Sequence, residues 1–143
     1  MEEEQASILR EYLLKEVEIL QDIIKRMAFN SFLIKGWTVT LVVVSLLVKS
    51  GQQHVHLAFI PLLVFWFLDA YFLWQERMYR KLYEWVIAHR LQTSEHLLDL
   101  NAYRFRSEVQ SIPRIMVSIT LFWFYATLAV LVAAFLFIQL KMF

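Results

Sequence analysis

The strongest constraint on this chain is its third apolar stretch, residues 115–138, which contains no charged side chain. A helix needs about 20 predominantly apolar residues to cross a bilayer core, and a buried helix of a soluble domain is rarely so long. Stretches 31–48 and 56–74 approach this length and are interrupted only by Lys35 and Asp69, respectively. The sequence therefore predicts an all-α membrane protein with three transmembrane helices.

Composition supports this class. Of 143 residues, 59% are hydrophobic and 16% aromatic, and only two are Gly and two Pro; a soluble domain of this size could not bury so much apolar surface. The absence of Cys excludes disulfides, thiolate chemistry and Cys-ligated zinc, and fits a cytoplasm-facing location. A net charge of +1 gives no support for a nucleic-acid partner.

Basic residues predict the orientation, because cytoplasmic segments of membrane proteins are enriched in Lys and Arg. With the N-terminus inside and the C-terminus outside, only Lys49 and Lys141 face the exterior. The expected order is a cytoplasmic amphipathic helix, first span, external loop, second span, cytoplasmic helical insert, third span and external tail, at residues 1–30, 31–49, 50–55, 56–74, 75–112, 113–140 and 141–143.

Within the cytoplasmic insert, helical spacing continues beyond Trp74, so the second span should extend for three or four turns as a helix. A further short helix is expected at "TSEHLLDL", residues 93–100. Ser111 and Pro113 are suited to begin the third span.

Lys35 and Asp69 should lie at similar depth, each about two turns from the inner interface. An isolated charge there is costly, so an ion pair that fixes helix register is the favoured interpretation. A role in a proton or ion pathway stays open. A catalytic acid is disfavoured, because no nucleophile and base accompany Asp69.

A charge cluster follows the membrane exit. Glu76 with Arg80, and Arg80 with Glu84, have the i,i+4 spacing of helical ion pairs, and Arg77 lies among them. The N-terminal helix carries a heptad-like apolar seam, for which we expect packing against the helix after residue 75 as well as self-association. The seam consists of Leu9, Leu13, Val17, Leu20, Ile24 and Met27.

Hydroxyl side chains recur at seven-residue intervals on the first and third spans. Such stripes can line a pore, but they more often mediate helix packing, which is the favoured interpretation. The residues are Thr38, Ser45, Ser118, Thr120, Tyr125 and Thr127.

Evidence for enzymatic chemistry is weak. Arg90 and His96 match the loose Arg-to-His spacing of HEPN ribonucleases, a pattern that arises readily by chance. His54 and His56 form an HxH pair without further nearby ligands, so a solvated loop is favoured over a metal site. No phosphate-binding Gly-rich loop or Ser-His-Asp pattern is present. The chain is expected to have no enzymatic activity, cofactor or bound metal.

The runs "IIKRMAFNSFLIKGWTVTLVV", "LDAYFLWQERMYRKLYEWV" and "DLNAYRF" resemble an uncharacterised family of small bacterial multi-pass membrane proteins. The architecture is similar to the SLATT-type membrane effectors of antiviral defence systems, in which the usual plan has two spans rather than three. The resemblance implies a bacterial inner-membrane location and directs attention to Lys35, Asp69, Glu76, Arg77 and Arg80.

Two functions follow as hypotheses. The first is a homo-oligomeric effector or channel that receives a cytoplasmic signal and permeabilises the membrane. A soluble partner on the cytoplasmic side is one source of that signal. The alternative is a non-conducting anchor or scaffold that recruits a soluble partner through its cytoplasmic helices. A proton-coupled transporter is disfavoured, because three helices per chain leave little room for a pathway.

Overall fold

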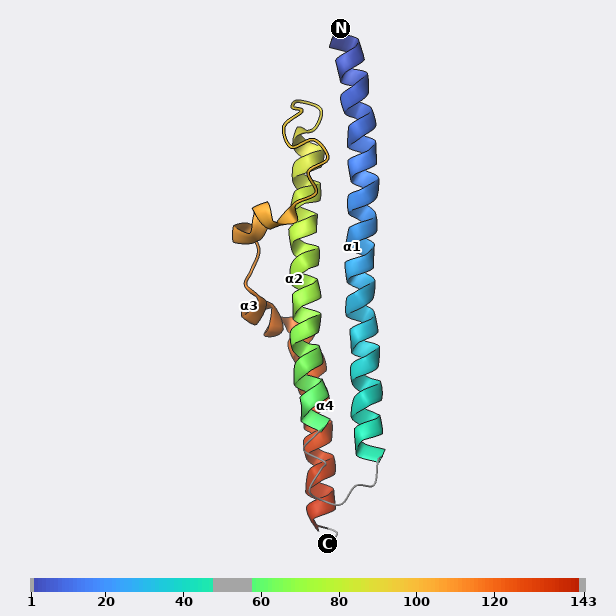
Figure 1. Cartoon of the computed structure of the whole chain (residues 1–143). Coiled ribbons are helices and arrows are strands. Elements are labelled where there is room, and N and C mark those ends of the chain that lie inside the picture. Colours follow the sequence, from blue (N-terminus) through green and yellow to red (C-terminus); the bar gives the residue numbers. More distant parts are fainter. Residues whose placement is uncertain (1, 48–57, 142–143) are drawn as a thin grey trace. The chain divides into compact units, whose positions relative to one another are not determined.

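The computed structural model describes residues 2–47 and 58–141, and within these residues all regular structure is helical (Figure 1). Three helices are long and apolar enough to cross a membrane, in agreement with the predicted all-α class. The elements are α1 (Glu2–Leu47), α2 (Phe59–His89), the 3-10 helix η2 (Ala102–Glu108), α3 (Ile112–Met116) and α4 (Ile119–Lys141). The three candidate spans belong to α1, α2 and α4.

The chain divides into two compact units. Unit 1 contains Met1–Phe29 and Leu73–Gln110, and unit 2 contains Asn30–Phe72 and Ser111–Phe143. Unit 1 thus takes the first part of α1, the second part of α2, and η2. Unit 2 takes the remaining parts of α1 and α2 together with α3 and α4. The sequence-based boundaries between cytoplasmic and membrane segments fall close to these divisions.

Helix α1 continues without interruption through residue 30, where the predicted cytoplasmic helix meets the first span. Neither Gly nor Pro occurs before Gly36, so no residue type in this region favours a break. Helix α2 likewise continues past Trp74 to His89, as predicted. Pro61 lies in the first turn of α2, where a backbone N–H would have no helical acceptor, so the absence of one in Pro costs no helical hydrogen bond.

The prediction of a helix at residues 93–100 is wrong. These residues form turns, and His96 and Leu98 have φ angles of 54° and 56°, which interrupt a right-handed helix. The next helical turn is η2, where the Asn101 side chain accepts a hydrogen bond from the Tyr103 N–H. Side chains from elsewhere in unit 1 hold the turns in place, as described below.

The third span is shorter than predicted, because the helix breaks at Val117 and Ser118 between α3 and α4. Ser111 occupies the N-cap position of α3, with Pro113 in the first turn, but the Ser111 side chain makes no capping hydrogen bond. The break removes a helical partner from the carbonyl of Met116, which instead accepts a hydrogen bond of 3.0 Å from Trp66 Nε1. An indole on α2 thus stabilises a break that local sequence alone did not indicate.

Candidate functional site

Asp69 is the centre of a polar cluster in unit 2, and its side chain is fully buried. Its Oδ2 lies 2.6 Å from Lys35 Nζ and 3.1 Å from the Tyr125 hydroxyl. Ser31 Oγ donates a hydrogen bond to Oδ1. One carboxylate therefore binds side chains from α1 and α4, and all three candidate spans meet at it.

The two α1 residues of the cluster are one helical turn apart, so they present their polar atoms to the same side. Lys35 Nζ also donates to Ser31 Oγ at 2.9 Å. The Lys35 side chain remains 28% exposed, whereas the carboxylate that it neutralises has no exposed surface. The pair predicted from depth alone is present in the structure, and Ser31 is an additional member.

Tyr125 connects α4 to α2 through its hydroxyl and its ring. The hydroxyl lies 3.2 Å from the Phe65 carbonyl oxygen as well as near Asp69, and the ring stacks on Trp66 with centroids 5.7 Å apart. The sequence placed Tyr125 in a hydroxyl stripe. Within the described chain it is a buried donor to a carboxylate.

The other stripe residues differ in exposure. Thr38 is buried and donates to the Ile34 carbonyl, while half-buried Ser45 donates to that of Leu41. Thr120 and Thr127 are exposed, and Thr127 donates to the carbonyl one turn earlier in α4. Ser45 and Thr127 therefore bond their own helices, whereas the buried Thr38 hydroxyl also interacts with the Tyr125 side chain.

Ser118 differs from the other stripe residues, because it stands at the break before α4. Its Oγ is buried and has no hydrogen-bond partner among the described residues.

A second buried acid–base pair lies in unit 1, and sequence reasoning missed its acid. The side chains of Glu16 and Arg90 are each 1% exposed, with Arg90 Nε 2.5 Å from Glu16 Oε2 and Nη2 3.0 Å from Oε1. Glu16 Oε1 also accepts the Leu98 N–H at 2.7 Å. The available signal was position, since Glu16 lies three residues after Leu13 and four before Leu20 on the apolar seam.

The N–H groups of the Arg90 guanidinium all have acceptors in this arrangement. Beyond Glu16, its guanidinium donates to the carbonyls of Thr93, Glu95 and His96 at 3.1, 2.7 and 3.0 Å. These five contacts match the five N–H groups of the side chain. No donor is left for a phosphate, so the geometry gives no support to the ribonuclease interpretation of Arg90 and His96.

The charge cluster after Trp74 forms ion pairs along α2. Arg80 binds Glu76, with Nη2 2.7 Å from Oε1, as predicted. Glu84 binds Lys81 at 2.7 Å instead of the predicted Arg80, because Arg80 is already paired with the carboxylate one turn earlier. The hydrogen bond and negative charge of Glu84 raise the pKa of Lys81 above its ordinary value.

The predicted seam packs within unit 1. Leu20 is fully buried, and the remaining seam residues are half-buried. Gln21 Nε2 donates to the Tyr83 hydroxyl at 3.3 Å, which places this part of α1 beside α2. The structure therefore shows the first part of α1 beside α2, as expected for the seam. Self-association through the seam remains a prediction.

Among the described residues, no group of three or more His, Asp or Glu side chains could hold a metal ion. The HxH pair, His54 and His56, lies outside the described residues, as does the predicted external loop.

Comparisons with protein-family models, curated proteins and solved structures found no match. Functional inference therefore depends on the geometry of this chain.

Proposed function

We propose that this chain is a non-conducting membrane anchor of a bacterial inner membrane, which holds unit 1 at the cytoplasmic face for a soluble partner. The N-terminus is inside and the C-terminus outside. This orientation is supported by the basic residues of segments 1–30 and 75–112, against which the exterior holds only Lys49 and Lys141.

The proposal depends on one observation: Asp69 is buried, and both of its carboxylate oxygens have partners within the chain. Ion and proton pathways through membranes need polar groups that face water or exchange partners. Asp69 has no exposed surface, and Lys35, Ser31 and Tyr125 occupy its oxygens. Such an arrangement favours a fixed structural junction over a conducting site.

Unit 1 offers a surface for the partner. A hollow of about 560 Å³ is lined by apolar Ile8, Tyr12, Leu14 and Leu98, with Glu11, Lys15 and Glu18 among them. Leu14 is 65% and Leu98 47% exposed, although each is an apolar residue in the part assigned to the cytoplasm. Exposed apolar groups with a charged surround are typical of protein interaction sites.

Affinity capture with the full-length chain in nanodiscs tests this function. We expect a stoichiometric soluble partner that is lost with Leu14→Gln and retained with Ile87→Gln, a matched change at another exposed position of unit 1. Planar-bilayer recordings of the same material, with and without the partner, should show no conductance. Reproducible single-channel currents would contradict the proposal.

A second candidate is the homo-oligomeric effector or channel of antiviral defence, with self-association through α4. Exposed residues recur on this helix at alternating steps of three and four, the spacing of a coiled-coil seam, and the smaller ones allow close approach. The positions are Thr120, Trp123, Thr127, Val130, Ala134 and Phe137.

Mass measurement in nanodiscs separates the two candidates. A monomer excludes a pore between copies, whereas a ring of four or more that loses its assembly with Thr127→Leu favours the channel. Thr40→Leu is a matched control, because Thr40 is an exposed threonine on α1 whose hydroxyl also bonds its own helix.

A further inference from the structure

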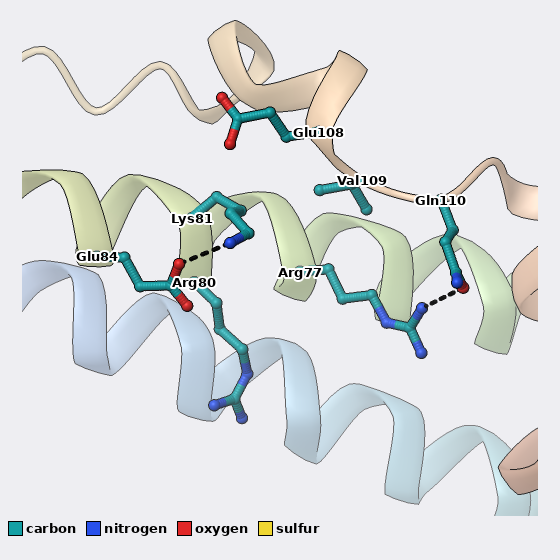
Figure 2. A pocket seen from close by; sticks show the side chains of 7 residues that line it. All are labelled: Arg77, Arg80, Lys81, Glu84, Glu108, Val109 and Gln110. Carbon is teal, nitrogen blue, oxygen red and sulfur yellow. Dashed lines mark hydrogen bonds and ion pairs between the residues drawn. The ribbon is translucent and has the colours of Figure 1, made fainter.

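Unit 1 contains a hollow beside the first turns of α2 after Trp74. It has a volume of about 240 Å³ and lies between α2 and the segment that follows η2 (Figure 2). Arg77 contributes from α2, and Gln110 from the other wall. Arg77 Nη1 donates to Gln110 Oε1 at 3.0 Å, which leaves further guanidinium N–H groups and the Gln110 amide N–H groups as donors.

Charge pairing distinguishes Arg77 from the cations next to it. Arg80 and Lys81 are each neutralised by a carboxylate on α2. The hydrogen-bond partner of Arg77 is a neutral amide, and no carboxylate oxygen of the described residues lies within 4.0 Å of it. Glu108 also lines the hollow, and its charge acts on Lys81.

Arg106 adds a second cation without a carboxylate partner among the described residues. Its guanidinium lies 5.9 Å from the ring centroid of Trp74, which in turn makes an edge contact with Tyr103 at 5.9 Å. Trp74 and Arg77 are three residues apart and share one side of α2. Arg106 therefore lies at the buried Trp74 ring, and Arg77 follows Trp74 by about one helical turn on α2.

This combination matches a membrane interface. Trp and Tyr prefer the headgroup level of a bilayer, and Trp74 ends the apolar stretch of the second span. Arginine binds phosphate oxygens through paired N–H donors. Taking the two arginines against Glu108, the surface carries one net positive charge, which complements the single negative charge of a phosphodiester.

We propose that Arg77, Tyr103, Arg106 and Gln110 form a binding site for the phosphodiester headgroup of an anionic phospholipid. The inference rests on the proposed membrane location with residues 75–112 on the cytoplasmic side. Arg77 and Gln110 hold the phosphate, and Arg106 adds the second charge. Tyr103, which is exposed and packs edge-on against the buried Trp74, sets the depth of the headgroup.

The test is a lipid-binding titration of the full-length chain in detergent, with phosphatidylglycerol and phosphatidylcholine of identical acyl chains. We expect phosphatidylglycerol to bind at least tenfold more tightly, and each of Arg77→Gln and Arg106→Gln to weaken it about tenfold. The matched control is Arg10→Gln with Arg26→Gln, which removes two exposed arginines from α1. This control should keep the preference.

Equal binding of both lipids by the unaltered chain would overturn the site, and this comparison needs no variant. An equal loss of phosphatidylglycerol affinity in the α1 control would also overturn the site, because the preference would then depend only on the net charge of the chain. Inorganic phosphate that displaces phosphatidylglycerol at millimolar concentration would assign the site to a free anion.

A third variant, Gln110→Glu, places a negative charge beside Arg77 without removing an arginine. It should abolish the preference for phosphatidylglycerol.

Failure here is distinguishable from failure of the membrane assignment. A chain that stays soluble without detergent refutes the membrane anchor itself. A detergent-dependent chain with the predicted topology and no lipid preference refutes only the headgroup site.

Discussion

The buried acid–base pairs of the two units differ in what completes their hydrogen bonds. In unit 1, the Glu16–Arg90 pair binds backbone groups, namely three carbonyls and the Leu98 amide. In unit 2, the Lys35–Asp69 pair is completed by the side-chain hydroxyls of Ser31 and Tyr125. The first pair therefore determines the path of a loop, and the second determines the register of helices.

The largest expected effect is that of Arg90→Met. It leaves Glu16 buried without a cation and three carbonyls without donors, so the free energy of unfolding should fall by about 3–5 kcal/mol. Denaturant titration in detergent measures the loss, and hydrogen exchange should show residues 93–98 losing protection first. Arg26→Met is the control at an exposed position. An unchanged loop would refute the assigned role.

Asp69→Asn should have a somewhat smaller effect, about 2–3 kcal/mol. Lys35 loses its counterion, but its 28% exposed side chain can turn its ammonium toward a more polar environment. The same unfolding titration measures the difference. A larger cost than that of Arg90→Met would reverse the ranking of the two pairs.

Double substitutions sharpen the contrast. Lys35→Met with Asp69→Leu replaces an ion pair by apolar groups and should return stability to within about 1 kcal/mol of the unaltered chain. Glu16→Leu with Arg90→Met should not recover, because the carbonyls of the 93–96 turn stay unpaired. Double-mutant cycles provide the two coupling energies. Equal recovery in both units would show that backbone contacts add nothing in unit 1.

The smallest effect is expected for Tyr125→Phe. It removes one hydroxyl near Asp69 and the Phe65 carbonyl while keeping the stack on Trp66, so the cost should be about 1 kcal/mol. Trp66→Phe, which loses the hydrogen bond to the Met116 carbonyl, serves as a comparison outside the charged pair. A loss above about 3 kcal/mol for Tyr125→Phe would mean that the hydroxyl is required to hold the ion pair closed.

Much of the fold could be predicted, because membrane spans follow from the length and apolarity of continuous segments. The contact between Lys35 and Asp69 could be predicted for the same reason, since two charges at equal depth on successive antiparallel helices have few other partners. The break at Val117 and Ser118 could not, because its stabilising donor, Trp66, lies on another helix.

The Glu16–Arg90 pair shows a different limit. Its acid and base are far apart in sequence, and a Glu near an apolar seam is usually a solvated flanking residue. The spacing of Arg90 to His96 suggests a catalytic pattern and does not indicate that Arg90 donates to carbonyls of the turn that follows it. The helix predicted at 93–100 failed for the same reason, since local propensity does not include a guanidinium that binds the carbonyl groups of Thr93, Glu95 and His96.

The order of residues around Asp69 has a consequence for biogenesis. Ser31 and Lys35 are translated before Asp69, so the counterion is already available when the aspartate-bearing helix leaves the ribosome. A hairpin of the first two hydrophobic helices can enter lipid with its charges compensated. The last helix then contributes only the neutral phenol of Tyr125, which lets it be inserted after the costly step is complete.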